Sequence, residues 1–309
     1  MTNIYIGIFV LLIEVMLQAL WIWSRQSGAF FNTFQKQKSY GPMIDAESKA
    51  STPSMGGIVF IVISILLCTF GDGDNKIWLF AAACGSVGLI DDGLKFFKHS
   101  SEGLTSLKKL RLQIVVSSIY AVFASVNCDI NLWSGISSPA WASIPLVIFF
   151  SVGLQNAVNV TDGLDGLAAG TVSLSLAAMA FLMGELNYDT AAALGLTLGF
   201  LWHNSPPAKV FMGDVGSHFL AGLLFALILF NGSILLLLPL SFLFGIEIIT
   251  VAIQIFSIRK FKRKIFKMAP LHHHFQLLGW KETLIVNRFY IIHICGMAVL
   301  YAVLSEFMK

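Results

Sequence analysis

The stretch Asn156-Ala-Val-Asn-Val-Thr-Asp-Gly-Leu-Asp-Gly166 carries four polar side chains at intervals of three residues and contains two glycines near its end. It follows the apolar run 144–154 and precedes the apolar run 167–183. The four side chains are those of Asn156, Asn159, Asp162 and Asp165. On a helix this spacing places them on one face. Asn and Asp often only cap helices, but further acidic clusters elsewhere in the chain favour a functional site.

The composition excludes an ordinary soluble protein. Of the 309 residues, 56% are hydrophobic and 12% are charged, whereas soluble domains carry roughly 25% charged residues. Apolar runs of about 20 residues recur along the chain and are continuous rather than alternating, which indicates membrane-spanning helices rather than barrel strands. No polar stretch is long enough for a soluble core. We therefore expect one integral membrane domain over residues 1–309, and an all-α polytopic fold.

The apolar runs predict ten transmembrane helices. Their approximate bounds are 4–23, 56–70, 76–90, 110–127, 140–158, 167–184, 190–204, 216–230, 233–257 and 287–305. The first run has no basic residue before it and no small-residue cleavage site after it, so we expect an anchor and not a signal peptide. The segments 71–75 and 231–233 are read as tight turns between antiparallel neighbours.

The basic residues provide an independent test of this count. The odd-numbered connections between the expected spans contain 18 of the 20 Lys and Arg residues, and only Lys76 and Lys309 fall on the other side. The positive-inside rule makes the Lys- and Arg-rich side cytoplasmic. Both termini then face outward, and the number of spans is even.

The same cytoplasmic side holds two further acidic motifs. Asp91-Asp92 ends the third expected span, where adjacent carboxylates repel each other unless a cation or a proton donor faces them. Asp214 lies in Phe211-Met-Gly-Asp-Val-Gly-Ser217, just before the eighth span. A solvated helix end for the pair, with Lys95 or Lys98 as partners, and a plain N-cap for Asp214 are the structural alternatives.

Basic residues, histidines and glycines complete the same surface. The ninth connection holds a basic run over residues 259–267, which suits anionic lipid headgroups, and the triplet 272–274 of histidines. Three consecutive histidines do not ligate one metal from a helix, whereas in an extended loop His272 and His274 share a face. Thr52–Gly57, preceded by Lys49, and Gly103–Lys109 each combine lysine with a helix start, an arrangement that suits phosphate.

Carboxylates beside lysines and helix N-termini suit phosphate groups bound to Mg²⁺. Their position at the lipid boundary suggests one lipid reactant and one water-soluble reactant. The residues alone therefore predict a membrane-embedded, Mg²⁺-dependent transfer of a phosphate-containing group.

At these motifs the chain resembles the polyprenyl-phosphate N-acetylhexosamine-1-phosphate transferases. The matching pieces come in family order over nearly the whole chain and are Thr52–Gly57, Gly88–Gly93, Gly103–Lys109, Asn156–Ala168, Phe211–Ser217 and Pro270–Gln276. The Pro-Leu-His-His-His-Phe piece resembles the branch that uses UDP-MurNAc-pentapeptide rather than UDP-GlcNAc. Leu107 departs from an often polar position of the family, and Ser54 replaces a common Thr.

The resemblance implies transfer of phospho-MurNAc-pentapeptide from UDP-MurNAc-pentapeptide to undecaprenyl phosphate, which gives lipid I and UMP. It also implies a homodimer in the bacterial cell membrane with a cytoplasmic active site, and no nucleic-acid partner is expected. The implied catalytic residues are Asp91, Asp92, Asp214 and His272, with Asp214 as the Mg²⁺ ligand. The implied substrate-binding residues are Lys49, Ser54, Lys109, Asn156, Asn159, Asp162, Asp165, Asn204, Phe211, Gly213, Ser217, His273 and His274.

Two questions stay open at this point. The lipid phosphate attacks the sugar-linked phosphorus directly, or Asp214 or one of Asp91 and Asp92 first forms a covalent intermediate. The alternative functions are a UDP-GlcNAc-using relative and, from a different class, a transporter, because Glu14 and Glu247 lie inside spans. Transporters place such acids near the midplane on related repeats, whereas here the other acids gather on one side and no internal repeat is visible.

Overall fold

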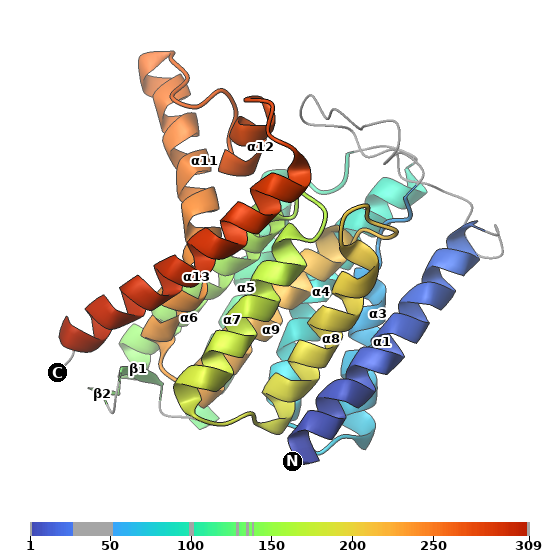
Figure 1. Ribbon diagram of the computed structural model, residues 1–309. Helices are drawn as coiled ribbons and strands as arrows, with labels where there is room; N and C mark the ends of the chain where they lie inside the picture. Colours follow the sequence, from blue (N-terminus) through green and yellow to red (C-terminus); the bar gives the residue numbers. More distant parts are fainter. Residues whose placement is uncertain are drawn as a thin grey trace.

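The computed structural model describes residues 2–26, 52–98, 102–127, 130–133, 136–137 and 139–307. Within these ranges the chain is helical except for one short β-hairpin, which the sequence analysis did not predict. Long helices run side by side and form a bundle (Figure 1). The expectation for Lys49 lies outside the described residues.

Each expected span has a helical counterpart. The helices before the turn at residues 162–166 are α1 (Thr2–Gln26), α3 (Gly57–Phe70), α4 (Asn75–Phe97), α5 (Ser106–Asn127) and α6 (Ala140–Thr161). Those after it are α7 (Leu167–Met183), α8 (Tyr188–Asn204), α9 (Gly213–Asn231), α10 (Leu237–Leu240), α11 (Phe242–Phe261), α12 (Leu271–Gln276) and α13 (Glu282–Phe307). The strands are β1 (Asn131–Trp133) and β2 (Ile136–Ser137), which pair antiparallel. A 3₁₀ turn, Ile234–Leu236, precedes α10.

Seven of these helices are long and apolar enough to cross a bilayer: α1, α4, α5, α6, α9, α11 and α13. The helices α3 and α7 are apolar but shorter. The protein is therefore a polytopic membrane protein.

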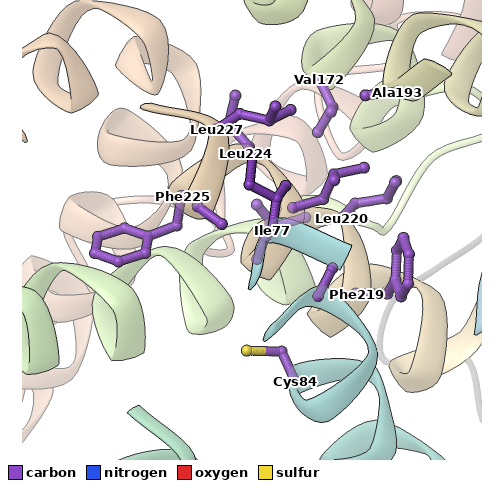
Figure 2. Close-up of a cluster of buried hydrophobic side chains, with 14 of the residues drawn as sticks. Ile77, Cys84, Val172, Ala193, Phe219, Leu220, Leu224, Phe225 and Leu227 are labelled. Carbon is purple, nitrogen blue, oxygen red and sulfur yellow. The ribbon is translucent and has the colours of Figure 1, made fainter. Parts of the chain in front are cut away.

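Helix α9 forms the centre of the bundle. Nearly its whole length from Val215 to Leu229 is buried, which is the pattern of a helix that is covered on all sides. Leu220, Leu224 and Leu227 pack among Ile77 and Cys84 of α4, as well as side chains from α7 and α8 (Figure 2). Asp214 lies in the first turn of this helix, so the most enclosed element of the fold carries the expected metal ligand.

Glycines let α9 approach its neighbours closely. A Cβ on Gly57 of α3 would collide with the backbone of Gly216, and one on Gly88 of α4 would collide with the backbone of Asp214. Small residues permit such contacts between membrane helices. These two glycines therefore bring α3 and α4 against the turn that carries Asp214.

The ninth expected span is broken. Helix α10 ends at Leu240 and α11 begins at Phe242, so Ser241 interrupts the run. Neighbouring helices satisfy the freed backbone groups: Ser175 Oγ donates to the Leu240 carbonyl at 2.6 Å, and Leu243 N–H donates to His293 Nδ1 at 3.3 Å. Broken membrane helices require such partners. Beyond the break, α11 projects from the bundle beside α12 (Figure 1).

Candidate active site

The aspartate pair lies inside helix α4 and not at its end. The third span was expected to stop near residue 90, but α4 continues to Phe97, and Asp91 and Asp92 are only 1% and 2% exposed. The helix can continue through the pair because Lys95 follows on the same face, 3.2 Å from Asp92 Oδ1 and in an ion pair with Asp91. Lysine at i+3 and i+4 compensates the acidic charges. The interpretation as a solvated helix end is therefore wrong.

Asp214 faces the pair from α9. One carboxylate oxygen from each of Asp91, Asp92 and Asp214 forms a group whose members all lie within 4.8 Å of one another. Asp214 is not an N-cap, because that position belongs to Met212. Its negative charge is stabilised by two lysines: Lys95 Nζ and Lys109 Nζ each lie 2.7 Å from Asp214 Oδ2. Lys95 was expected only as an ion-pair partner of Asp91 and Asp92, and its contact with Asp214 was not predicted from the sequence.

Backbone amides fix both carboxylates of the pair. Leu104 N–H donates to Asp91 Oδ1 at 2.6 Å, and Val215 N–H donates to Asp92 Oδ2 at 3.1 Å. Gly213 has a φ of +71°, and a Cβ there would lie 2.6 Å from Asp92 Oδ2. Glycine at this position therefore lets the α9 turn meet the carboxylate.

A network of hydrogen bonds between polar side chains holds Asp214 in place. Asn159 Nδ2 donates to Asp214 Oδ1 at 2.8 Å and to Ser217 Oγ at 2.9 Å. Because His218 Nδ1 lies 2.8 Å from the Asp214 carbonyl, it carries the hydrogen, and Nε2 is left to accept from Gln113 at 3.0 Å. Asn156 in turn donates to Gln113 Oε1 at 2.9 Å.

Gln113 and His218 were not predicted from the sequence as members of the site. A detectable signal existed for His218: it is a polar side chain four residues after Asp214 in an otherwise apolar helix, and such residues usually have a functional or structural partner.

The opening stretch does not form one continuous helix. Helix α6 ends at Thr161, Asp162 is its C-cap, and Gly166, with a φ of +79°, starts α7. The expected single helical face therefore holds only for Asn156 and Asn159. Asp162 is half-buried at the turn, and its pKa is raised to about 8 by burial and then by the negative charges of Asp214, Asp92 and Asp165. The carboxyl of Asp162 is thus mostly protonated at neutral pH in the metal-free protein.

Asp165 and Asn204 organise a second group beside the cluster. Asp165 Oδ2 accepts from Ala208 N–H at 3.0 Å, and Asn204 Oδ1 accepts from Gly166 N–H at 3.1 Å. Asn204 is the last residue of α8, before the Pro206-Pro207 segment. Both side chains therefore hold the loop between α8 and α9, which leads to Phe211.

Phe211 is half-buried, and its backbone pairs with the segment that contains Ser54. Phe211 N–H donates to the Pro53 carbonyl at 2.8 Å, and its own carbonyl accepts from Gly56 N–H at 2.9 Å. The Ser54 carbonyl accepts from Trp21 of α1 at 3.2 Å. These bonds attach the segment 53–57 to the turn before Asp214.

The three histidines occupy a short helix, α12, and not an extended loop, so His272 and His274 do not share a face. His272 is fully buried and contacts Glu247 of α11, with Nδ1 and Oε2 3.1 Å apart. His273 Nδ1 contacts Gln276 Oε1 at 2.7 Å, and His274 Nδ1 accepts from Lys267 N–H at 3.1 Å. His272 borders the turn after α6, where a Cβ on Gly163 would meet its ring.

Burial and the charge of neighbouring His272 lower the pKa of His273 to about 4. The His273 imidazole is therefore neutral at physiological pH. Glu247, an acid inside the ninth expected span, has a polar contact with a residue of a different helix.

This arrangement defines a class of protein. A group of three carboxylates and two lysines, on α4 and on the first turns of α5 and α9 in a polytopic bundle, fits a membrane enzyme that handles phosphate. Residues 75–232, about half of the chain, match the family model described as Glycosyl transferase family 4.

Curated relatives narrow the class. The phospho-N-acetylmuramoyl-pentapeptide-transferase of Dictyoglomus turgidum is 38% identical over 282 residues, which cover 87% of this chain and 90% of the relative. Those of Clostridium acetobutylicum and Halalkalibacterium halodurans are 37% and 35% identical and cover 79% and 90% of this chain, and 82% and 92% of their own lengths. The chain belongs to the phospho-N-acetylmuramoyl-pentapeptide-transferase family.

Proposed function

We propose that the chain transfers phospho-MurNAc-pentapeptide from UDP-MurNAc-pentapeptide to undecaprenyl phosphate at the cluster of Asp91, Asp92, Asp214, Lys95 and Lys109. The products are lipid I and UMP. The observation that carries the proposal is the convergence of three carboxylates within 4.8 Å, beside two lysines that reach Asp214. Family membership supplies the substrates.

The cluster fits Mg²⁺. Its donors are carboxylate oxygens, which this hard cation prefers, and Mg²⁺ in proteins takes one or two carboxylates together with phosphate oxygens. Asp214 is the proposed ligand, assisted by Asp91 or Asp92. When bound, Mg²⁺ neutralises negative charge on the diphosphate of the donor.

Lys95 and Lys109 have a separate role in this proposal. Both ammonium groups contact Asp214 Oδ2 and so neutralise the carboxylate that is proposed to hold the cation. With Mg²⁺ held by the carboxylates, Lys95 and Lys109 would be available to donate to phosphate oxygens. The site thereby exchanges internal ion pairs for contacts with metal and substrate.

Residues on the adjacent loops bind the nucleotide sugar. Phe211 is half-exposed and stacks on the uracil ring, with Asp165 and Asn204 beside it. Asn159, Ser217 and Asn156 keep Asp214 in place, and Asp162, Gly213 and Ser54 line the approach. His272, His273 and His274 lie on α12, and Lys49 belongs to the same proposed binding set.

The proposed chemistry is direct attack. An oxygen of the lipid phosphate forms a bond to the sugar-linked phosphorus, the bond from that phosphorus to the UMP oxygen breaks, and UMP leaves. Asp91 or Asp92 orients the lipid phosphate or takes its proton. A covalent route requires a phosphorylated enzyme, so trapping such a species with the nucleotide substrate and without lipid would contradict direct attack.

The proposed topology has ten spans, with the active site facing the cytoplasm and both termini outside. The excess of basic residues in connections of one parity supports it. In Figure 1 both termini lie toward the end of the bundle opposite α12. A homodimer in the bacterial membrane completes the proposal.

The test is release of UMP by the purified full-length protein given undecaprenyl phosphate, Mg²⁺ and UDP-MurNAc-pentapeptide, with Asp214→Asn in parallel. We expect Mg²⁺-dependent release by the natural sequence and its loss in the variant. Turnover of UDP-GlcNAc instead would overturn the substrate and keep the chemistry. Absence of turnover with both donors, in folded protein, would favour the transporter alternative.

A further inference from the structure

Glu247 and His272 form an enclosed pair between α11 and α12. Both side chains are 0% exposed, and His272 Nδ1 lies 3.1 Å from Glu247 Oε2. Among the described residues, His272 is the one basic group within ion-pair distance of Glu247. Glu247 Oε1 and His272 Nε2 have no hydrogen-bond partner within the described part of the chain.

The free ring nitrogen of His272 lies beside a segment that carries proposed substrate-binding residues. A Cβ added to Gly163 would collide with Nε2, so this atom faces the turn between α6 and α7. The same turn carries Asp162 and Asp165. An unpartnered nitrogen at a buried position is costly unless a ligand completes its hydrogen bonding.

The burial of the pair indicates whether Nε2 carries a hydrogen. A buried carboxylate needs a positive partner or must be protonated. Either neutral form of the pair, carboxylate with imidazolium or carboxylic acid with imidazole, holds a hydrogen between Glu247 and Nδ1 and a second hydrogen on Nε2. Removing that second hydrogen would leave a net negative charge at a buried site. Nε2–H is therefore a hydrogen-bond donor.

Among the described residues, no acceptor lies within hydrogen-bond distance of Nε2, so a bound substrate can supply one. The neighbouring His273 ring is 4.2 Å away between centroids and neutral, so it does not add a second cation. The nucleotide sugar offers several hydrogen-bond acceptors, which are the oxygens of its diphosphate. Charge-assisted hydrogen bonds to phosphate are short and strong.

We propose that Glu247 is a positioning residue for the transfer reaction: it holds the His272 ring and keeps Nε2 protonated, so that Nε2–H donates to a diphosphate oxygen of the nucleotide sugar. The inference rests on the function proposed above. Glu247 itself touches no reacting atom and acts through His272.

The experiment is a double-mutant cycle in the UMP-release assay on the full-length protein, with Glu247→Gln, His272→Ala and the double variant. Glutamine in place of Glu247 is neutral and can accept from Nδ1–H through its amide oxygen, which leaves a neutral ring with its hydrogen on Nδ1 and none on Nε2. We expect Glu247→Gln to lower kcat about 10- to 100-fold, the range known for partners that orient histidine ligands, with KM for the nucleotide sugar changed less than threefold. In the His272→Ala background the same substitution should change kcat less than twofold.

Glu14→Gln is the matched control. Glu14 is also a fully buried membrane glutamate, bonded to Gln18 and remote in sequence from α12, and we expect its substitution to leave kcat within twofold. Should Glu247→Gln fail to fold, Glu247→Asp replaces it, because it keeps the charge and displaces the carboxylate by one methylene. It is then expected to lower kcat at least threefold, again only when His272 is present.

Two results would overturn the inference: an unchanged kcat in folded Glu247→Gln, or an equal loss with and without His272. Neither would touch the proposed function, which depends on turnover by the natural sequence and its loss in Asp214→Asn.

Discussion

Lys109 Nζ in α5 lies 2.7 Å from Asp214 Oδ2 in α9, and Lys95 Nζ in α4 lies at the same distance from the same oxygen. One carboxylate oxygen thus collects two ammonium groups from different helices. This arrangement joins α4, α5 and α9 at the proposed active site and gives each lysine a measurable role.

Replacing Lys109 by Met should lower kcat/KM about 10- to 100-fold, because a hydrogen bond to a charged group is worth about 1.5–3 kcal/mol and each 1.4 kcal/mol is a factor of ten. UMP release measures the effect. The exposed neighbour Lys108 provides the control, and Lys108→Met should stay within twofold of the natural sequence. Equal losses in the two variants would show that general surface charge, and not the contact with Asp214, matters.

Mg²⁺ should stabilise the folded protein, because a ligand that binds only the native state adds about 2.7 kcal/mol at one hundred times its Kd. The observable is a rise in Tm of the detergent-solubilised protein on addition of Mg²⁺, reversed by EDTA. In Asp214→Asn the rise should disappear, since the cluster of three carboxylates loses one oxygen donor. An undiminished rise in that variant would place the cation elsewhere.

The raised pKa of Asp162 predicts that the stability of the folded protein in EDTA depends on pH. Its pKa is about 8 in the fold and about 4 in an unfolded chain. Between these values the native state holds a proton that the unfolded state has lost, so this group lowers stability progressively as the pH rises from about 4 to about 8.

Asp162→Asn removes this titration. The Tm of the variant relative to the natural sequence should therefore increase between pH 5 and pH 8. A Tm difference that does not change with pH would contradict the raised pKa. Adding Mg²⁺ should reduce the difference, because the cation offsets the surrounding negative charge that raises this pKa.

Helix positions were largely accessible from the sequence, because long apolar runs leave few alternatives in a bilayer. The break at Ser241 was missed, although Pro239, two residues before it, is a local signal of a helix boundary. What permits the break is tertiary: Ser175 and His293, on α7 and α13, satisfy the backbone groups that it frees. No local pattern in the run reports partners that lie 50 or more residues away.

The candidate site could be predicted from the sequence less completely than the helices. Asp91, Asp92 and Asp214 were each singled out by polarity within apolar surroundings, and the structure brings them together. Their charge compensation was not foreseen, and the pair was therefore placed at a helix end, whereas α4 continues past it with Lys95 on the same face. The direction of each histidine was likewise undecided until α12 fixed the backbone, because side-chain faces differ between helix and extended chain.

Gly57 and Gly153 offer a matched test of the close contact between α3 and α9. A Cβ at position 57 would collide with the backbone of Gly216, which cannot rotate aside as a side chain does, whereas a Cβ at position 153 would enter open space. Gly57→Ala should therefore destabilise the protein by about 1–3 kcal/mol, the cost of overpacking. Gly153→Ala should be neutral or stabilising by up to about 1 kcal/mol, because alanine is the better helix former. Thermal unfolding in detergent compares the two.

The same two variants can also be compared by their transferase activity. Gly216 follows Asp214 by two residues in α9, so a backbone shift at the contact also moves the carboxylate. Gly57→Ala should lower kcat at temperatures where the variant is still folded, and Gly153→Ala should not. Equal Tm and kcat values for the two variants would show that the α3–α9 contact tolerates a side chain, and that the position of Asp214 does not depend on it.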